Sequence, residues 1–290
     1  MKNNSYFESL MQSTGMRVFL YLVILLVSSL IGVALAVIPI ANGSDLGLKI
    51  GQGISSVMSF LVPPVVFYLI TRQEHRMKAL GFRAFRPWWL ALIGALLMVV
   101  EIPILNQVTE WGQAIHFGPA FEKLGEWMKS LSESNEELTL RMFNVSTVGG
   151  LLLNLLIMAL IPAIGEEMTF RGVLQQSLAR RMNPHVAILL TAAVFSFIHF
   201  EFSGFFSRML AGILLGYMFH ITGSLWVSGL MHFVNNGLLV VLYYLNNIGV
   251  IDDIDRFDKA PHISIVITCA VAMVLLLVWC WRKKSADSQA

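Results

Sequence analysis

The feature that most constrains this chain is a series of long apolar runs, each about the length of a membrane-crossing helix. A hydrocarbon core about 30 Å thick requires roughly 20 apolar residues for one helical crossing. Only helices and closed barrels satisfy their own backbone hydrogen bonds in lipid, and runs of this length are typical of helices. Of the 290 residues 13% are charged, whereas soluble domains carry about 25%. The sequence therefore predicts an all-α, polytopic transmembrane helix bundle.

We expect about eight spanning helices, with bounds set by the apolar runs. These runs are 17–41, 50–71, 87–108, 147–181, 185–200, 208–221, 224–247 and 263–281. The first run contains Ala34-Leu35-Ala36, which resembles the cleavage site of a secretory signal. Because the apolar stretch continues past this site to Ile40, we interpret the run as a retained membrane helix.

The positions of lysine and arginine predict the orientation of the chain. Basic residues are concentrated in two connections and in the tail: Arg72, Arg76, Lys78, Arg83, Arg86, Arg180, Arg181, Arg282, Lys283 and Lys284. With eight crossings, all of these segments fall on one side, and positively charged connections mark the cytoplasmic side. We therefore expect both termini in the cytoplasm and a location in the plasma (inner) membrane. The net charge of +2 gives no indication of nucleic-acid binding.

The chain divides into three parts on this interpretation. Residues 1–146 hold the N-terminal transmembrane helices and an outer amphipathic connector at 110–141, in which aromatic and aliphatic residues alternate with charges. We interpret this segment as a connector, with a lid as the alternative. Residues 147–247 form a helical core that holds the candidate catalytic residues described below, and 248–290 hold the final helix and the basic tail. Cys269 and Cys280 match no zinc or disulfide spacing.

Ionisable side chains inside membrane helices are costly, and this makes them candidates for a functional site. They are concentrated in three segments, 162–172, 195–199 and 232–236. In the first segment, Glu167 and Arg171 are four residues apart, so they lie on one helical face as an ion pair. Glu166 points about 100° away and is the carboxylate left to act as a general base. An inert salt-bridge cluster is the structural alternative.

The second segment reaches the same depth as the first. The sequence Arg181–Pro184 predicts a turn, because proline disfavours helix in the residue before it. Glu166 lies about as far before this turn as His199 lies after it. In an antiparallel hairpin both would lie roughly 20–25 Å from the turn, so we expect the two side chains to meet.

The third segment follows another hairpin, which turns at residues 222–224. His232 and Asn236 share a helical face, with Asn235 adjacent, and could hold a carbonyl oxygen or its oxyanion. Interhelical hydrogen bonding alone is the alternative for both asparagines. Gly212 and Gly216 are predicted to let the two helices of this hairpin pack closely.

Two chemistries fit this set of side chains. In one, Glu166 and His199 activate a water while His232 and Asn236 stabilise the oxyanion. In the other, Glu166, His199 and His232 bind zinc, with the fourth coordination position open. Arg171 weighs against a dication at this place, whereas the two adjacent acids weigh for it, so both alternatives stay open.

The same residues resemble the CAAX protease and bacteriocin-processing family (CPBP, or Abi) of intramembrane endopeptidases. Its motif E-E-x-x-x-R is matched by Glu166, Glu167 and Arg171, with Phe170 and Gly172 around the arginine. Its motif F-x-x-x-H is matched by Phe195 and His199, and its motif H-x-x-x-N is matched by His232 and Asn236. Residues 223–226 resemble the usual lead-in to the third motif, and the resemblance covers about 151–243.

The resemblance implies that Glu166 activates water with His199 as its partner, and that His232 and Asn236 form the oxyanion site. It also implies a peptide or membrane-anchored protein substrate, with or without a lipid group, and it leaves zinc dependence open. A non-catalytic immunity or scaffold protein on the same fold and a proton-coupled transporter are the rival classes. A serine protease using Ser228 and His232 is a weaker idea, because two side chains on one helix rarely aim at each other.

Overall fold

The computed structural model describes residues 13–71, 76–85, 88–114, 118, 122–257 and 259–287. These residues are almost entirely helical, and no strand occurs among them. The predicted all-α class is therefore confirmed.

Seven helical rods in the described part are long and apolar enough to cross a membrane. Several rods combine α-helices with π-helical segments, which are labelled η. The rods are α2 (Thr14–Ile40), α3–η1–α4 (Asp45–Ser56, Val57–Leu61, Val62–Ile70), α6–α7 (Trp89–Val100, Ile102–Gln113), α9–η3–α10–η4–α11 (Val148–Asn154, Leu155–Leu160, Ile161–Glu167, Met168–Gln175, Gln176–Leu178), α13 (Phe205–Thr222), α14 (Leu225–Asn247) and α15 (Ile263–Asp287). The chain is an integral, multi-pass membrane protein.

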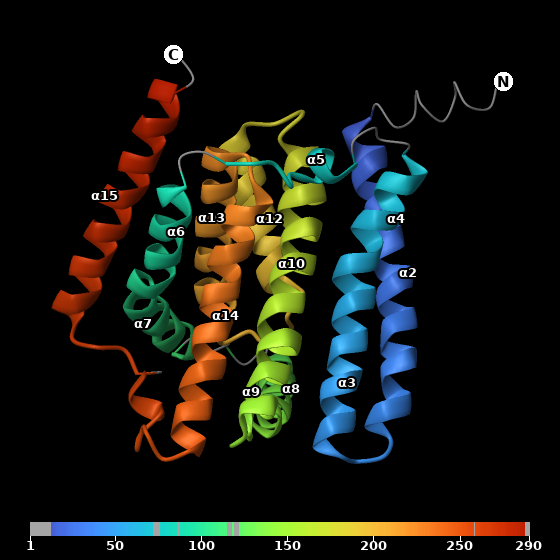
Figure 1. Ribbon diagram of the computed structural model, residues 1–290, viewed down its shortest axis with the longest axis vertical. Coiled ribbons are helices and arrows are strands. Elements are labelled where there is room, and N and C mark those ends of the chain that lie inside the picture. Colours follow the sequence, from blue (N-terminus) through green and yellow to red (C-terminus); the bar gives the residue numbers. More distant parts are fainter. Residues whose placement is uncertain are drawn as a thin grey trace.

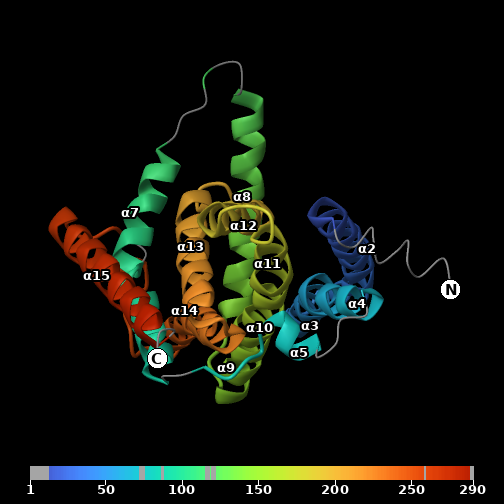
Figure 2. The ribbon, with the colours of Figure 1, turned by 90° about the horizontal axis from the view of Figure 1, so that it is seen from above.

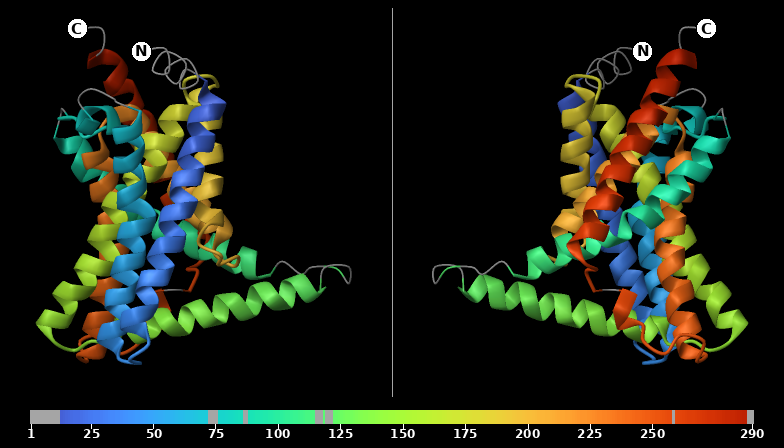
Figure 3. Two further views of the ribbon diagram at one scale, coloured as in Figure 1. Left: turned by 90° about the vertical axis from the view of Figure 1, so that its right-hand side faces the viewer. Right: turned by 90° about the vertical axis from the view of Figure 1, so that its left-hand side faces the viewer.

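The remaining predicted span, 185–200, corresponds to the shorter helix α12 (Pro184–Phe197), which has 14 residues. At 1.5 Å per residue it extends about 21 Å, less than the hydrocarbon thickness of about 30 Å. It ends before the predicted limit because the backbone turns after Phe197, and Phe200 adopts a left-handed φ of 51°. In Figure 3 the link from α12 to α13 lies well short of the end of the bundle where α3 begins.

The rods lie side by side in one bundle (Figure 1). Viewed from above, α2, α3 and α4 occupy one side, α7 and α15 the other, and α10, α12, α13 and α14 lie between them (Figure 2). The helix α8 (Glu122–Phe143) runs across the bundle and projects from it (Figure 3). It corresponds to the predicted amphipathic connector, of which Phe117 and Phe121 lie outside the described residues. The place of α8 at the membrane interface stays a prediction.

The basic connections lie at one end of the bundle. The start of α2, the short helix α5 (Arg76–Leu80), the turn between α11 and α12, and the end of α15 are all at the upper end in Figure 1. Arg72 and Arg86 lie outside the described residues. The predicted orientation requires all basic segments to lie on one side of the membrane, and this arrangement meets that requirement. The assignment of this end to the cytoplasm stays a prediction.

Two glycines of α13 pack differently from the prediction. A Cβ added at Gly212 would lie 3.2 Å from Ala192 on α12, and one at Gly216 would lie 2.9 Å from Ile188 on the same helix. The glycine face of α13 is thus turned towards α12 and η4 rather than towards α14. The close approach lets Arg171 and Gln175 on η4 reach backbone carbonyl oxygens of α13. The predicted turn at 222–224 is confirmed, with Gly223 at a φ of 65°.

Candidate active site

The predicted ion pair between Glu167 and Arg171 is present. Arg171 Nη1 lies 2.6 Å from Glu167 Oε1, and both side chains are fully buried. Arg171 Nη2 also donates to the carbonyl oxygen of Gly212 at 2.8 Å. The two residues lie where α10 gives way to the π-helical segment η4, and such segments are frequent at functional sites. The pair links this rod to α13 and holds the end of α10 in place.

His232 of α14 completes a buried network with the same carboxylate. Its Nδ1 lies 3.2 Å from Glu167 Oε1, and the hydroxyl of Ser228, one turn earlier, is buried without a hydrogen-bond partner among the described residues. Because a carboxylate only accepts hydrogen bonds, Nδ1 is the nitrogen of His232 that carries the proton towards Glu167. The other nitrogen, Nε2, faces Glu166 at 3.7 Å from its Oε2.

His199 approaches Glu166 from the other side, as the hairpin argument predicts. Its Nε2 lies 4.0 Å from Glu166 Oε2, and its Nδ1 bonds the carbonyl oxygen of Phe195 at 2.7 Å. His199 is about one-third exposed, whereas Glu166 and His232 are buried. The site is therefore open on the side of His199, where α12 ends inside the bundle.

Phe195 organises these groups in a way that the sequence did not indicate. Its ring centroid lies 5.0 Å from that of His199 and 5.9 Å from that of His232, in edge-on contacts. The Arg171 guanidinium lies 5.1 Å over the same ring. Such contacts limit the rotation of the imidazoles and place a cation on the electron-rich face of the ring. In the sequence, the feature that could have indicated this role is the position of an aromatic residue one helical turn before His199.

The carboxylate of Glu166 has one oxygen without a partner. Among the described residues its Oε2 is buried and accepts no hydrogen bond. The two imidazole nitrogens that face this oxygen, at 3.7 and 4.0 Å, are too distant for a direct hydrogen bond. Separations of this size between polar atoms suit a bridging water. The structure thus brings Glu166, His199 and His232 together around one unsatisfied oxygen.

The asparagines are less closely tied to this centre. Asn235 Nδ2 donates to Asn236 Oδ1 at 3.2 Å, which leaves the Asn236 amide nitrogen available to a ligand. Asn236 lies one turn beyond His232 on α14, but in the described part of the chain no hydrogen bond joins it to Glu166 or to either histidine. The contact of Asn236 with an oxyanion stays a prediction.

The geometry of the site bears on the zinc alternative in both directions. In the described ranges, no group of three or more His, Cys, Asp and Glu side chains is arranged to hold a metal ion. The fixed charge of the nearby Arg171 guanidinium also opposes a dication. The carboxylate–histidine contact between Glu167 and His232, on the other hand, is the kind that supports a metal ligand.

Glu201 and Arg208 form a further ion pair beside the site, which the sequence argument missed. Arg208 contacts both the carboxylate and the backbone carbonyl of Glu201, and Ser203 and the Gly204 amide also donate to that carboxylate. Burial alone would raise the pKa of Glu201, but Arg208 and these hydrogen bonds hold that pKa below its ordinary value of 4.5. The pair stiffens the link that follows His199, and Arg208 also acts electrostatically on His199.

Glu101, at the junction of α6 and α7, is a second buried acid that the sequence argument passed over. It is 0% exposed, and within the described residues neither carboxylate oxygen accepts a hydrogen bond. It shares no ion pair with the Glu166 network. An acid in the middle of a 25-residue apolar rod was the signal that could have found it.

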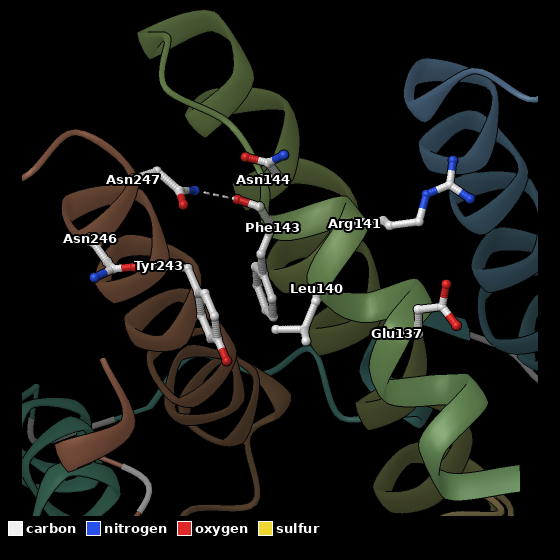
Figure 4. A pocket seen from close by; sticks show the side chains of 8 residues that line it. All are labelled: Glu137, Leu140, Arg141, Phe143, Asn144, Tyr243, Asn246 and Asn247. Carbon is white, nitrogen blue, oxygen red and sulfur yellow. Dashed lines mark hydrogen bonds between the residues drawn. The ribbon is translucent and has the colours of Figure 1, made fainter. Parts of the chain in front are cut away.

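A surface pocket lies away from this chemistry, between α8 and α14 (Figure 4). Its lining includes the stacked rings of Phe143 and Tyr243 and the side chain of Asn247, which donates to the Phe143 carbonyl oxygen at 2.8 Å. Tyr243 lies 11 residues beyond His232, or about 16 Å along the helix. The pocket is therefore not part of the Glu166 site.

The bundle and its buried carboxylate–imidazole network together define a polytopic membrane protein with a cluster of ionisable side chains inside the helical bundle. Residues 148–238 match the family model described as Type II CAAX prenyl endopeptidase Rce1-like. This segment contains all three motifs and belongs to the CAAX protease and bacteriocin-processing family, a family of proteases. No curated protein and no solved structure matches the chain significantly.

Proposed function

We propose that this protein is an intramembrane endopeptidase in which Glu166 activates a water for attack on a peptide bond. The observation that carries the proposal is the unpaired Glu166 Oε2, which faces the Nε2 atoms of His199 and His232 at 4.0 and 3.7 Å. A buried carboxylate with an unsatisfied oxygen beside two imidazoles has the composition of a general-base site. Family membership of residues 148–238 supports the same reaction class.

The reaction begins with a water held between Glu166 and His199. Glu166 takes a proton from this water as its oxygen attacks the carbonyl carbon of the substrate. The carbonyl π electrons move onto oxygen. His232, as an imidazolium that carries a second proton on Nε2, and the Asn236 amide stabilise the resulting oxyanion as donors. Collapse of the tetrahedral intermediate breaks the C–N bond, and the proton held by Glu166 passes to the leaving amine.

Glu167 and Arg171 act in this proposal as positioning residues. The arginine neutralises Glu167, and the carboxylate then holds His232 by its Nδ1. The imidazole is thereby fixed with Nε2 towards Glu166. A rigid support of this kind is needed because small displacements of catalytic groups lower rates strongly.

The zinc-dependent version of the protease remains the chemical alternative, with Glu166, His199 and His232 as ligands. A bound zinc ion would supply Lewis acidity and an activated water. In the version without metal, 1,10-phenanthroline changes the rate by less than about twofold, and purified protein contains far less than one zinc per chain. A zinc content near one per active chain, together with loss of activity on chelation and recovery on adding zinc, would favour the alternative.

The proposed substrate is a peptide or membrane-anchored protein whose cleavage site reaches His199, the exposed member of the site. Lipidated and unmodified substrates both fit this description. We also propose that the protein lies in the plasma membrane with both termini in the cytoplasm, on the basis of the basic end of the bundle.

The experiment compares the membrane proteomes of cells that express the wild-type chain or Glu166→Gln. Glu101→Gln is a matched control, because it makes the same isosteric change at another buried membrane glutamate. We expect new peptide termini in the wild type and in Glu101→Gln, and their loss in Glu166→Gln. If Glu166→Gln leaves the termini unchanged, the protein is a non-catalytic scaffold or acts by another route. Ion flux that depends on Glu166 in liposomes would instead indicate the transporter class.

A further inference from the structure

Arg17 is a buried cation near the start of α2. Its side chain is 4% exposed, and its guanidinium lies 5.2 Å over the ring of Phe67. Its Nε atom donates to no described residue, and no described carboxylate forms an ion pair with it. A buried arginine within a membrane helix is costly unless an anion or another acceptor compensates it. The aromatic ring supplies only partial compensation.

Two more arginines converge on the same place. The Tyr68 phenol interacts electrostatically with Arg17, Arg83 and Arg180, and Arg17 and Arg180 also repel each other. The Tyr68 hydroxyl is itself occupied, since it lies 3.1 Å from the carbonyl oxygen of Gly172 and 3.2 Å from that of Ala79. Three positive charges thus act on one neutral ring, which holds none of them by a hydrogen bond among the described residues.

The three arginines come from separate segments that meet at one end of the bundle. They belong to the start of α2, the loop after α5 and the turn after α11 (Figure 1). Arg83 and Arg180 are exposed, and Arg83 Nε is anchored on the Lys78 carbonyl oxygen at 2.9 Å. No described aspartate or glutamate forms an ion pair with any of the three. The cluster therefore offers guanidinium groups at the level where helices leave the membrane.

We propose that Arg17, Arg83 and Arg180 bind the phosphate group of an anionic membrane phospholipid. Guanidinium groups match phosphate oxygens in geometry and charge, and basic pockets between transmembrane helices bind lipid head groups. A lipid is favoured over a free phosphate because the apolar face of α2 continues from Arg17 along the outside of the bundle. Phe19, Leu26 and Leu30 on this helix are about 60% exposed and offer a surface for the acyl chains.

The test uses the full chain purified in neutral detergent and measures lipid binding by native mass spectrometry. Phosphatidylglycerol, phosphatidylcholine and inorganic phosphate are titrated separately at about 150 mM salt. The test variant is Arg83→Gln/Arg180→Gln, which changes exposed residues and leaves buried Arg17 intact. The control is Arg282→Gln/Lys283→Gln, which removes the same charge from exposed positions of α15 at the same end of the bundle.

We expect the test variant to bind phosphatidylglycerol about 25-fold more weakly, since each basic residue near the surface contributes about fivefold. The control should lose at most about threefold, because distant charges are screened. Phosphatidylcholine, which has no net charge, should bind to wild type and to the test variant with equal affinity. Unchanged affinity in the test variant, or an equal loss in both variants, would overturn the site. Saturable binding of inorganic phosphate with competition against the lipid would overturn its assignment to a lipid. Peptidase activity plays no part in these readouts, so the outcome is independent of the proposed function.

Discussion

The buried charges between α10, η4 and α14 contact one another, whereas those of α2 and of the α6–α7 junction do not. Glu167 meets Arg171 at 2.6 Å and His232 at 3.2 Å. Glu101 and Arg17 are just as buried, yet neither forms an ion pair with a described residue. In the first region, the charges fix the geometry of a site. In the second, a charge must be neutralised by a proton or by a ligand from outside the chain.

The largest expected difference between the two regions is in catalysis. Glu166→Gln removes the general base and should lower the cleavage rate by about 10²–10⁴-fold. Glu101→Gln should leave the rate within about twofold, because the residue lies outside the site. Initial rates on a peptide substrate in proteoliposomes would measure both.

Thermal unfolding of the same two variants is the control for this comparison. Glu166→Gln should melt close to the wild type, since the Oε2 atom has no hydrogen bond to lose. If Glu101→Gln lowers the rate as strongly as Glu166→Gln does, the division into two regions is wrong.

The second effect concerns stability. Glu167→Gln leaves the Arg171 guanidinium buried without its counter-charge and should destabilise the fold by about 3–5 kcal/mol. The double variant Glu167→Gln/Arg171→Met should recover part of this loss, because both buried charges are then gone. Melting temperatures in detergent report the difference.

Activity separates the structural role of this pair from its role in positioning. The double variant should stay impaired in turnover although it folds, because His232 loses the carboxylate that orients it. Full recovery of turnover in the double variant would show that the pair only stabilises the protein.

The smallest effect concerns the ion pair of Glu201 and Arg208, and it depends on pH. Because the pKa of Glu201 is lowered in the folded protein, the ionised carboxylate stabilises the fold at pH values above the ordinary carboxyl pKa. The contribution is lost as the pH falls through the folded pKa. Glu201→Gln should therefore lower the free energy of unfolding at pH 7 by no more than about 1 kcal/mol. The stabilities of the two proteins should converge in acid.

A melting series from pH 7 down to pH 3 would test this sign. A gap between wild type and Glu201→Gln that widens as the pH falls would contradict it. Arg208→Gln is a matched variant and should show the same convergence, since it removes the partner that lowers the pKa.

Much of the fold and part of the site could be predicted from the chain alone. Long apolar runs indicated the helical bundle, because lipid leaves a backbone few alternatives to helix. The four-residue spacing predicted the Glu167–Arg171 pair, and equal distance from the turn at Pro184 predicted the meeting of Glu166 and His199. Both predictions rest on regular helix geometry, which holds over short stretches.

Features that depend on how helices face one another could not be predicted. The glycines of α13 were assigned to α14 but pack against α12, and α12 ends earlier than its apolar run. The contact of His232 with Glu167 and the roles of Phe195 and Arg208 join segments far apart in the chain. Helix rotation and packing set these contacts, and a hydrophobic pattern does not specify rotation when most faces are apolar.

The sequence by itself thus determined the class of protein, its build from apolar helices and the residues that carry charge into the membrane. Only the tertiary structure decided which of those charges find partners. The reason is that a charge within lipid is costly wherever it lies, so composition alone marks it, whereas its compensation depends on side chains from other helices at the same depth. That difference separates the Glu166 site from Glu101 and Arg17.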